Sequence, residues 1–224
     1  MDWALGNLDL LAALTVQHIR LSVPPILLGL LFALPLGWLA FRFPRTRGIV
    51  LSGVGVLYAI PSLALFSLLP ALIGTSTLSE LNVTVALTIY AVAILARSVA
   101  EALDSVDRTV RQSATALGYS SWRRFWAVEL PLAGPVILAG LRVAAASTVS
   151  LVTVGVLVGV QSLGYLFTNG FERRILEEIF TGVVLTMVVA LLFDVLLVVL
   201  GRILMPWTRV NTRRAPTRRM AVRP

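Results

Sequence analysis

Long uncharged stretches separated by short charged segments run along the whole chain. Residues 21–41 and 49–78 carry no charged side chain at all. The hydrocarbon core of a bilayer is roughly 30 Å thick, and a helix needs about 20 apolar residues to cross it. Both stretches are long enough, so the pattern predicts membrane-spanning helices over residues 21–41 and about 49–73.

Three further apolar stretches contain only one or two charges each. They predict spans over residues 81–100, 131–160 and 179–205, because Arg97 in the first of them can extend its guanidinium to the membrane surface. The expected fold is therefore all-α and integral to the membrane. We expect five transmembrane helices in a single domain over residues 1–205.

The amino-acid composition excludes several classes of enzyme and metal site. Hydrophobic residues make up 58% of the 224 and charged residues 13%, whereas soluble domains carry about 25% charged residues. The sequence contains neither cysteine nor lysine. A thiolate site, a Walker A phosphate loop and Schiff-base catalysis are thereby excluded. We expect no catalytic residues, no metal and no cofactor.

Arginines gather in alternate segments between the predicted spans. Three segments hold most of them: Arg42, Arg45, Arg47, Arg108, Arg111, Arg123, Arg124 and seven from Arg202 to Arg223. By the positive-inside rule these segments face the cytoplasm, with the amino terminus outside and the carboxyl terminus inside. Topology thus accounts for the net charge of +8 without a nucleic-acid partner. The basic tail, residues 206–224, is predicted to be disordered and is interpreted as a topology signal.

The segment over residues 106–131, between the third and fourth predicted spans, has the most specific pattern. A helix is predicted up to Leu117, and the small side chains of Ser113, Ala114 and Ala116 leave a shallow face that another protein can approach closely. Gly118 is expected to stop this helix in a left-handed conformation.

A second short helix is predicted directly afterwards. Ser120 can cap it, and Trp122, Phe125 and Trp126 follow at i, i+3 and i+4 spacing. Pro131 then falls in the first turn of the fourth span, where a missing N–H is tolerated. The segment is interpreted as a rigid projection that a partner grips on the cytoplasmic side.

This segment resembles the EAA loop of permease subunits of ABC importers, in which nine residues separate a glycine from an aliphatic residue, any residue, then Leu-Pro. Gly118, Val128, Leu130 and Pro131 keep that spacing. The resemblance implies coupling roles for Leu130 and Pro131. It also implies that the ATPase-docking residues are Gln112, Ser113, Ala114, Ala116, Leu117, Gly118 and Trp122. The usual Glu-Ala-Ala start is Gln112-Ser113-Ala114 here.

Other runs extend the resemblance over residues 17–171. They are QHIRLS, LPLG, AIPSLALFSLLP, ALTIYA, LPLAGPVILAGLR and GVQSLG, in that order. Together they resemble permeases for glycine betaine, choline and carnitine, although residues 93–98 lack a common proline and asparagine, and GVQSLG replaces a run closer to GAGGLG. The resemblance implies a type I importer permease in a bacterial inner membrane. Its implied partners are two copies of a separate ATPase, a second permease copy or paralogue, and an external binding protein.

Several residues have two interpretations each. Pro61, also a candidate coupling residue, and Ser62 lie inside the second span, where they form either a pore-lining bend or a static kink. Aromatic rings could bind a quaternary ammonium group, although membrane-belt or packing roles are favoured for most of them; they are Tyr58, Phe66, Tyr90, Tyr165, Phe167 and Phe171. The candidate pathway or gate residues are Ser62, Tyr90, Gly164, Phe167 and Phe171. His18 is expected to be an exposed residue at the membrane surface.

Asp194 is an ionisable residue inside the fifth span, which suggests either a proton relay or a structural ion pair. A pair with Arg142 or Arg97 is favoured over proton coupling. The rival functional class is a stand-alone, ion-coupled secondary transporter or channel that uses Asp194. Proton relays usually contain chains of intramembrane acids, which this sequence does not show. A purely structural scaffold would leave the patterned segment at 106–131 without a role.

Overall fold

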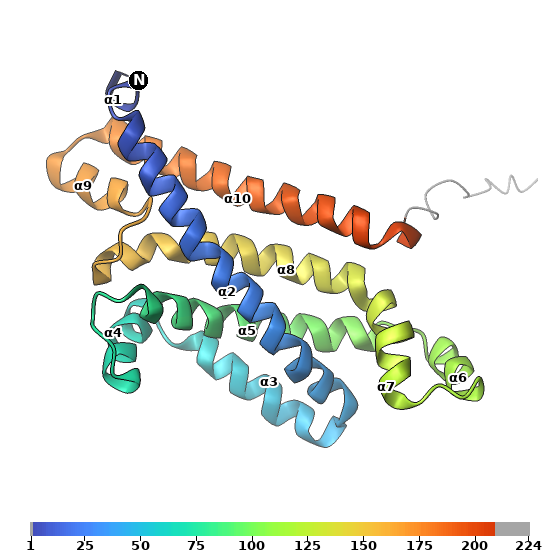
Figure 1. Cartoon of the computed structure of the whole chain (residues 1–224). Coiled ribbons are helices and arrows are strands. Elements are labelled where there is room, and N and C mark those ends of the chain that lie inside the picture. The colour runs from blue at the N-terminus through green and yellow to red at the C-terminus, as the bar shows by residue number, and fades with distance from the viewer. Residues whose placement is uncertain (1, 209–224) are drawn as a thin grey trace, which may run out of the picture.

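The protein is an all-helical bundle, as predicted, and Figure 1 shows its arrangement in a computed structural model that describes residues 2–208. Most of the predicted basic tail lies outside the described residues. In chain order the helices are α1 (Asp2–Leu5), α2 (Leu8–Arg42), α3 (Pro44–Ala59), α4 (Ser62–Ile73), α5 (Glu80–Asp104), α6 (Arg108–Ala116), α7 (Ser121–Arg124), the π-helix η1 (Phe125–Glu129), α8 (Leu130–Val152), the 3-10 helix η2 (Thr153–Val158), α9 (Tyr165–Arg173) and α10 (Leu176–Leu204).

Helix α5 lies in the middle of the bundle and packs against α2 and α8, and α2 crosses both α5 and α8 in the view of Figure 1. Helices α2 and α5 cross closely because two glycines of α2 face α5. A Cβ atom on Gly29 would overlap Ala91, and one on Gly37 would lie 2.5 Å from the Cβ of Val99. Small residues let membrane helices approach in this way. Gly29 and Gly37, the second of which belongs to the LPLG run, therefore set the close α2–α5 contact.

Four helical stretches within residues 2–208 are long and apolar enough to cross a membrane, and α3 with α4 makes a fifth if this bent pair is one span. The fifth would correspond to the predicted span at 49–73. The two helices meet at an angle of 100°. The break lies at Ile60 and Pro61, both with extended backbone, because proline has no N–H to continue the helical hydrogen bonds.

The first long helix extends beyond the predicted 21–41 and begins at Leu8. The expectation that His18 is exposed at the membrane surface is wrong. His18 of α2 is fully buried, and its Nε2 lies 3.0 Å from the carbonyl oxygen of Val149 in α8. The prediction placed the start of the span after the charge of Arg20 and so left His18 outside it. A neutral imidazole with a hydrogen-bonding partner can, however, lie in an apolar interior.

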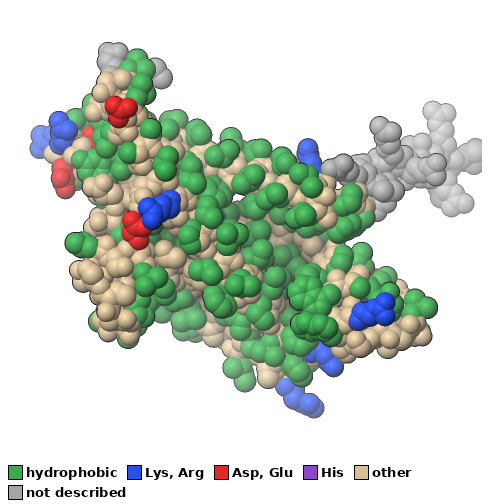
Figure 2. Space-filling model, in the orientation of Figure 1, with side chains coloured by type: hydrophobic (Ala, Val, Ile, Leu, Met, Phe, Trp, Pro, Cys, Tyr) green, Lys and Arg blue, Asp and Glu red, His purple; other side chains and the backbone are tan. Residues whose placement is uncertain are grey.

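The surface of the single chain is largely apolar along the bundle and charged towards its ends. Figure 2 shows hydrophobic side chains over the middle of the face that it draws. On α10 most large hydrophobic side chains are exposed, among them Met187, Leu191 and Leu196. An aliphatic surface of this kind is suited to lipid or to another membrane helix.

Candidate functional site

Helix α6 projects from one end of the bundle, beside α7 (Figure 1). Asp107 caps its start: Oδ1 accepts hydrogen bonds from the backbone N–H and the hydroxyl of Thr109, at 2.7 and 2.8 Å. These two bonds hold the pKa of the Asp107 carboxyl below its usual range. The cap is therefore ionised at neutral pH, where a negative charge at a helix start is favourable.

The predicted stop at Gly118 is confirmed. Its φ is 84°, in the left-handed region that favours glycine. The N–H of Gly118 bonds the carbonyl of Thr115, and the N–H of Tyr119 bonds the carbonyl of Ala114. These bonds close the last turn of α6, so the chain reverses sharply into α7.

The second short helix is not separate from the fourth span, contrary to the prediction. Ser120 caps α7 by accepting from the N–H of Arg123, but α7 continues through the π-turn η1 directly into α8. Within that turn the N–H of Leu130 reaches back to the carbonyl of Phe125. Pro131 lies in the first turn of α8, as predicted, and the π-turn before it joins α7 and α8 into one helical stretch.

Arg124 connects the two arms of the projection. Its Nε donates to Oε1 of Glu129 at 2.8 Å, and its Nη1 donates to the hydroxyl of Thr115 on α6 at 2.7 Å. Glu129 is only 2% exposed. Arg124 thus joins α6, through Thr115, to the buried Glu129 in η1, directly before α8, by charge-assisted hydrogen bonds. Arg124 was predicted only as one of the arginines on the cytoplasmic side, and no sequence pattern pointed to its contact with Glu129.

Arg111 fastens α6 to the end of α2. Its Nη2 donates to the carbonyl of Val106 at 2.7 Å, and its guanidinium lies 5.2 Å from the centre of the Phe41 ring. Beneath it, Phe125 packs edge-on against Trp38 of α2. The projection is thus braced at its base by both charged and aromatic contacts.

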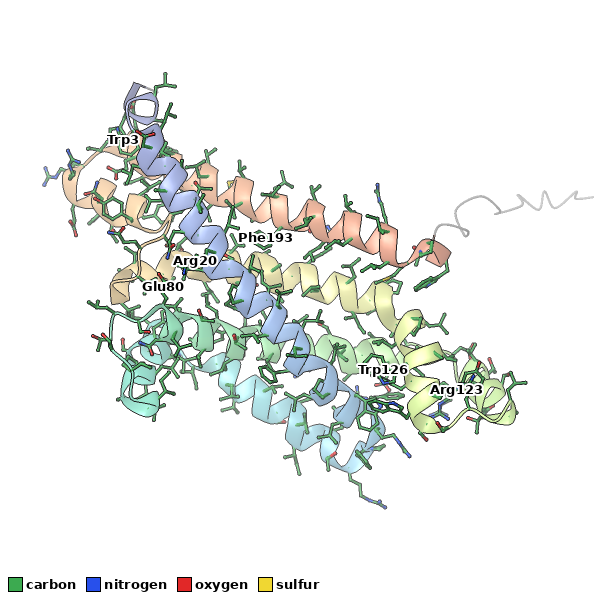
Figure 3. All side chains as sticks on the ribbon, in the orientation of Figure 1. Trp3, Arg20, Glu80, Arg123, Trp126 and Phe193 are labelled. Carbon is green, nitrogen blue, oxygen red and sulfur yellow. The ribbon has the colours of Figure 1, made fainter. Side chains whose placement is uncertain are left out.

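Most of the predicted docking residues lie on the outside of the projection. Leu117 is 78% exposed and Trp122 is 64% exposed. Figure 3 marks the position of the projection with Arg123 and Trp126. Ala114 alone is buried. The other exposed members of the predicted set are Gln112, Ser113, Ala116 and Gly118.

A shallow cavity of about 330 Å³ indents this surface. It is lined by Thr109, Val110, Ser113, Ala114, Leu117, Tyr119 and Val128. Most of the lining side chains are apolar, and several are small, so the cavity can accept a side chain of a partner protein beside α6.

The pathway candidates Ser62 and Tyr90 meet at the broken helix. The Tyr90 hydroxyl donates to the carbonyl of Ile60 at 2.6 Å, directly before Pro61 and Ser62. The Tyr58 ring lies edge-on to Tyr90, with 5.9 Å between ring centres. Tyr90 is thus buried as part of the support for the break, whereas Pro61 and Tyr58 are exposed on the single chain.

The remaining pathway candidates lie at the opposite end from α6, in and before α9 (Figure 1). Gly164 is buried, and a Cβ there would collide with the carbonyl oxygen of Thr153. Phe167 is half-buried and Phe171 is 78% exposed. The predicted site residues therefore fall into separate regions: the projection, the broken helix and this far end.

Arg142 of α8 and Asp194 of α10 form a two-pronged ion pair. Nε to Oδ1 is 2.6 Å and Nη2 to Oδ2 is 2.9 Å. The pair lies away from the projection and from the broken helix, and both side chains are partly exposed on the single chain. No group of three His, Asp or Glu side chains within residues 2–208 could hold a metal ion.

Sequence comparison places the fold among known transporters. The chain is 31% identical over 209 residues to the osmoprotectant import permease protein OsmW of Salmonella typhimurium, covering 92% of this chain and 97% of that one. It is 30% identical over 180 residues to the carnitine transport permease protein OpuCB of Listeria monocytogenes, covering 80% and 81%. The resemblance to osmoprotectant permeases is thereby confirmed.

Structure comparison supports the same fold. An inward facing structure of the MetNI methionine ABC transporter matches with a TM-score of 0.80 at 20% identity, over 88% of this chain and 97% of that one. An amino acid ABC transporter matches with a TM-score of 0.69. Residues 25–210 match the binding-protein-dependent transport system inner membrane component family, and the chain belongs to that family.

Proposed function

We propose that this chain is the membrane-spanning subunit of an ATP-driven importer for a small osmoprotectant, such as glycine betaine, choline, carnitine or a proline-like solute. An external binding protein delivers the solute, and a separate ATPase, present in two copies, hydrolyses ATP. Membership of the transport family, and the similarity to an osmoprotectant import permease and a carnitine transport permease, support this proposal. The braced projection of α6 and α7 is the observation that carries it, because an isolated pore would not need one.

The exposed side of α6 is the surface on which the ATPase docks. Gln112 and Ser113 supply polar contacts there, while Ala116 and Leu117 supply a small apolar face. The exposed side chain of Trp122 extends this surface from α6 onto α7. The adjacent cavity beside α6 provides room for one partner side chain. A shallow face framed by an exposed leucine and an exposed tryptophan matches the make-up of a protein interface centre.

Movement of the ATPase reaches the spans through the brace. When ATP closes the ATPase dimer, α6 is displaced, and the contacts of Arg124 with Thr115 and Glu129 pass that displacement to η1. Leu130 and Pro131 follow within the same continuous helix. ATP binds one conformation better than the other, so it shifts the protein from inward-open to outward-open.

The solute passes between two permease copies, or between this chain and a paralogue, beside the broken helix. Non-helical backbone at membrane depth is tolerated only where it is buried in protein or lines a water-filled cavity. Pro61 is exposed on the single chain, so its surroundings in the assembly are a pathway or a partner. Ser62 and the Tyr90-supported break form the bend, and Gly164, Phe167 and Phe171 form the outer gate where the binding protein docks.

The stand-alone, ion-coupled alternative receives no support from Asp194. Both carboxylate oxygens of Asp194 accept hydrogen bonds from Arg142. A carboxylate held in this way is stabilised in its charged form, whereas a proton carrier must readily change its protonation state.

Reconstitution tests the proposal. The chain is incorporated into proteoliposomes with its ATPase, binding protein and any paralogous permease, and uptake of radiolabelled glycine betaine, choline, carnitine and proline is measured. Uptake of at least one solute should require internal ATP and all added subunits. An ATPase variant unable to hydrolyse ATP is the control. Uptake driven by a proton gradient with no ATPase present would overturn the proposal.

A further inference from the structure

A second cavity, of about 430 Å³, lies at the base of the projection, and the transport cycle outlined above assigns it no ligand. Its lining residues are Phe41, Arg42, Pro44, Asp104, Arg108, Arg111, Arg124 and Glu129. They come from the ends of α2 and α5, the starts of α3 and α6, and the α7–η1 segment. The cavity therefore opens where several membrane helices end, at the level expected for lipid headgroups.

Positive charge exceeds negative charge around this cavity. Four arginines line it, against the two carboxylates of Asp104 and Glu129. Glu129 is already paired with Arg124, and Asp104 is paired with Arg47 from outside the cavity. On the face drawn in Figure 2, blue side chains and no red ones appear at the end where the projection lies. The cavity is thus suited to an anion.

Arg111 supplies an independent sign of a missing acceptor. Its Nη2 bonds the carbonyl of Val106 and its guanidinium lies over Phe41, but its Nε is buried without a hydrogen-bond partner. Buried donors are nearly always paired in folded proteins, with protein, water or ligand. Arg42 and Arg108 flank it, are exposed, and make no ion pair with an acid among residues 2–208.

We propose that this cavity is a phosphate-binding site, filled by the headgroup of an anionic phospholipid or by a soluble phosphate. Guanidinium groups bind phosphate oxygens through paired, charge-assisted hydrogen bonds, and basic pockets between helix ends on the cytoplasmic side of membranes bind anionic headgroups. The exposed guanidinium groups of Arg42 and Arg108 bind the phosphate oxygens, and the Arg111 guanidinium in the same lining adds positive charge.

A phosphate bound here would join the end of α2 to the base of α6. Arg42 belongs to α2, whereas Arg108 and Arg111 belong to the first turns of α6. The docking face of α6, formed by Gln112, Ser113 and Leu117, does not line the cavity. The site therefore stiffens the projection without blocking the ATPase, and it stands whether or not the transported solute is an osmoprotectant.

Binding to the purified full-length chain in neutral detergent tests the site by titration calorimetry. The probes are short-chain phosphatidylglycerol, short-chain phosphatidylcholine and inorganic phosphate. We expect phosphatidylglycerol, phosphate or both to bind, and phosphatidylcholine to bind at least about tenfold more weakly. Binding of phosphatidylglycerol alone identifies lipid as the source, and binding of phosphate alone identifies a soluble ion.

Two variants locate the binding. The double variant Arg42→Gln, Arg108→Gln removes two exposed charges that make no ion pair among residues 2–208; the Arg42 guanidinium lies 5.7 Å from the centre of the neighbouring Phe43 ring. The variant should weaken binding about tenfold or more. Arg45→Gln removes an exposed arginine at the same end but outside the cavity and should change binding less than about twofold. No anion binding by the wild type, or equal effects of the two variants, would overturn the proposal.

Discussion

The hydroxyl of Tyr90 donates a hydrogen bond to the carbonyl oxygen of Ile60, with 2.6 Å between the two oxygens. This contact joins α5, in the middle of the bundle, to the bend between α3 and α4, where two apolar helices meet at 100°. Because Pro61 cannot donate an N–H and the chain leaves the helix here, carbonyl groups near the break lose their helical partners. Tyr90 satisfies one of them and so fixes the position of the bend.

Tyr90→Phe should weaken this bend. The variant keeps the ring and its edge-on contact with Tyr58 but removes the hydrogen bond, leaving a carbonyl without its donor. We expect a loss of about 1–2 kcal/mol in the free energy of unfolding and a melting temperature lower by a few degrees. Thermal unfolding of the purified protein in detergent measures this change in melting temperature. Tyr58→Phe is the matched control, because no hydrogen bond of the Tyr58 hydroxyl is recorded, and an equal loss in both variants would contradict the assignment.

Gly118→Val should uncouple transport from ATP hydrolysis. At a φ of 84° a β-branched residue is strained, so the turn between α6 and α7 must change shape. We expect a cost on the order of 1–2 kcal/mol and a fall in solute moved per ATP hydrolysed, measured together in proteoliposomes. Gly118→Asn is the control because asparagine tolerates this conformation, and it should retain most coupling. Unchanged coupling in the valine variant would count against the rigid-projection mechanism.

Glu129→Gln should loosen the brace. The substitution keeps the size of the side chain but leaves the Arg124 guanidinium without its buried anion. Since Arg124 is partly exposed, we expect a loss on the order of 2 kcal/mol rather than the larger penalty of a fully buried pair. In proteoliposomes we expect the variant to keep hydrolysing ATP while its solute uptake falls. Asp104→Asn, which breaks the solvent-exposed pair with Arg47, is the control and should cost less than about 1 kcal/mol.

The sequence predicts the helices well where charge spacing reports membrane boundaries. The predicted spans at 81–100 and 179–205 lie largely on α5 (Glu80–Asp104) and α10 (Leu176–Leu204), and Pro61 marks the break between α3 and α4. The 100° angle at that break could not be predicted, because it depends on Tyr90 and the packing of α4 on α5. The burial of His18 was missed for a similar reason, since its partner is a backbone carbonyl of another helix.

In the projection, local sequence patterns predict some features and miss others. Gly118 and Ser120 act locally, so their turn and cap could be predicted from adjacent residues. Arg124 and Glu129 are five residues apart, and such residues lie on different faces of an α-helix. Only the π-turn at η1, whose hydrogen bonds span five residues, brings them together. Sequence periodicity alone gives no signal for that turn.

The ion pair between Arg142 and Asp194 gives the last prediction. Asp194→Leu alone leaves a cation without its partner on the apolar surface of the bundle, so expression and thermal stability should fall. The double variant Arg142→Leu, Asp194→Leu removes both charges and should recover most of that loss, as expected for interacting residues in a double-mutant cycle. Its ATP-driven uptake should stay within about twofold of the wild type, because replacing a whole pair by apolar residues is often neutral. A well-folded double variant without uptake would instead show that Asp194 takes part in transport.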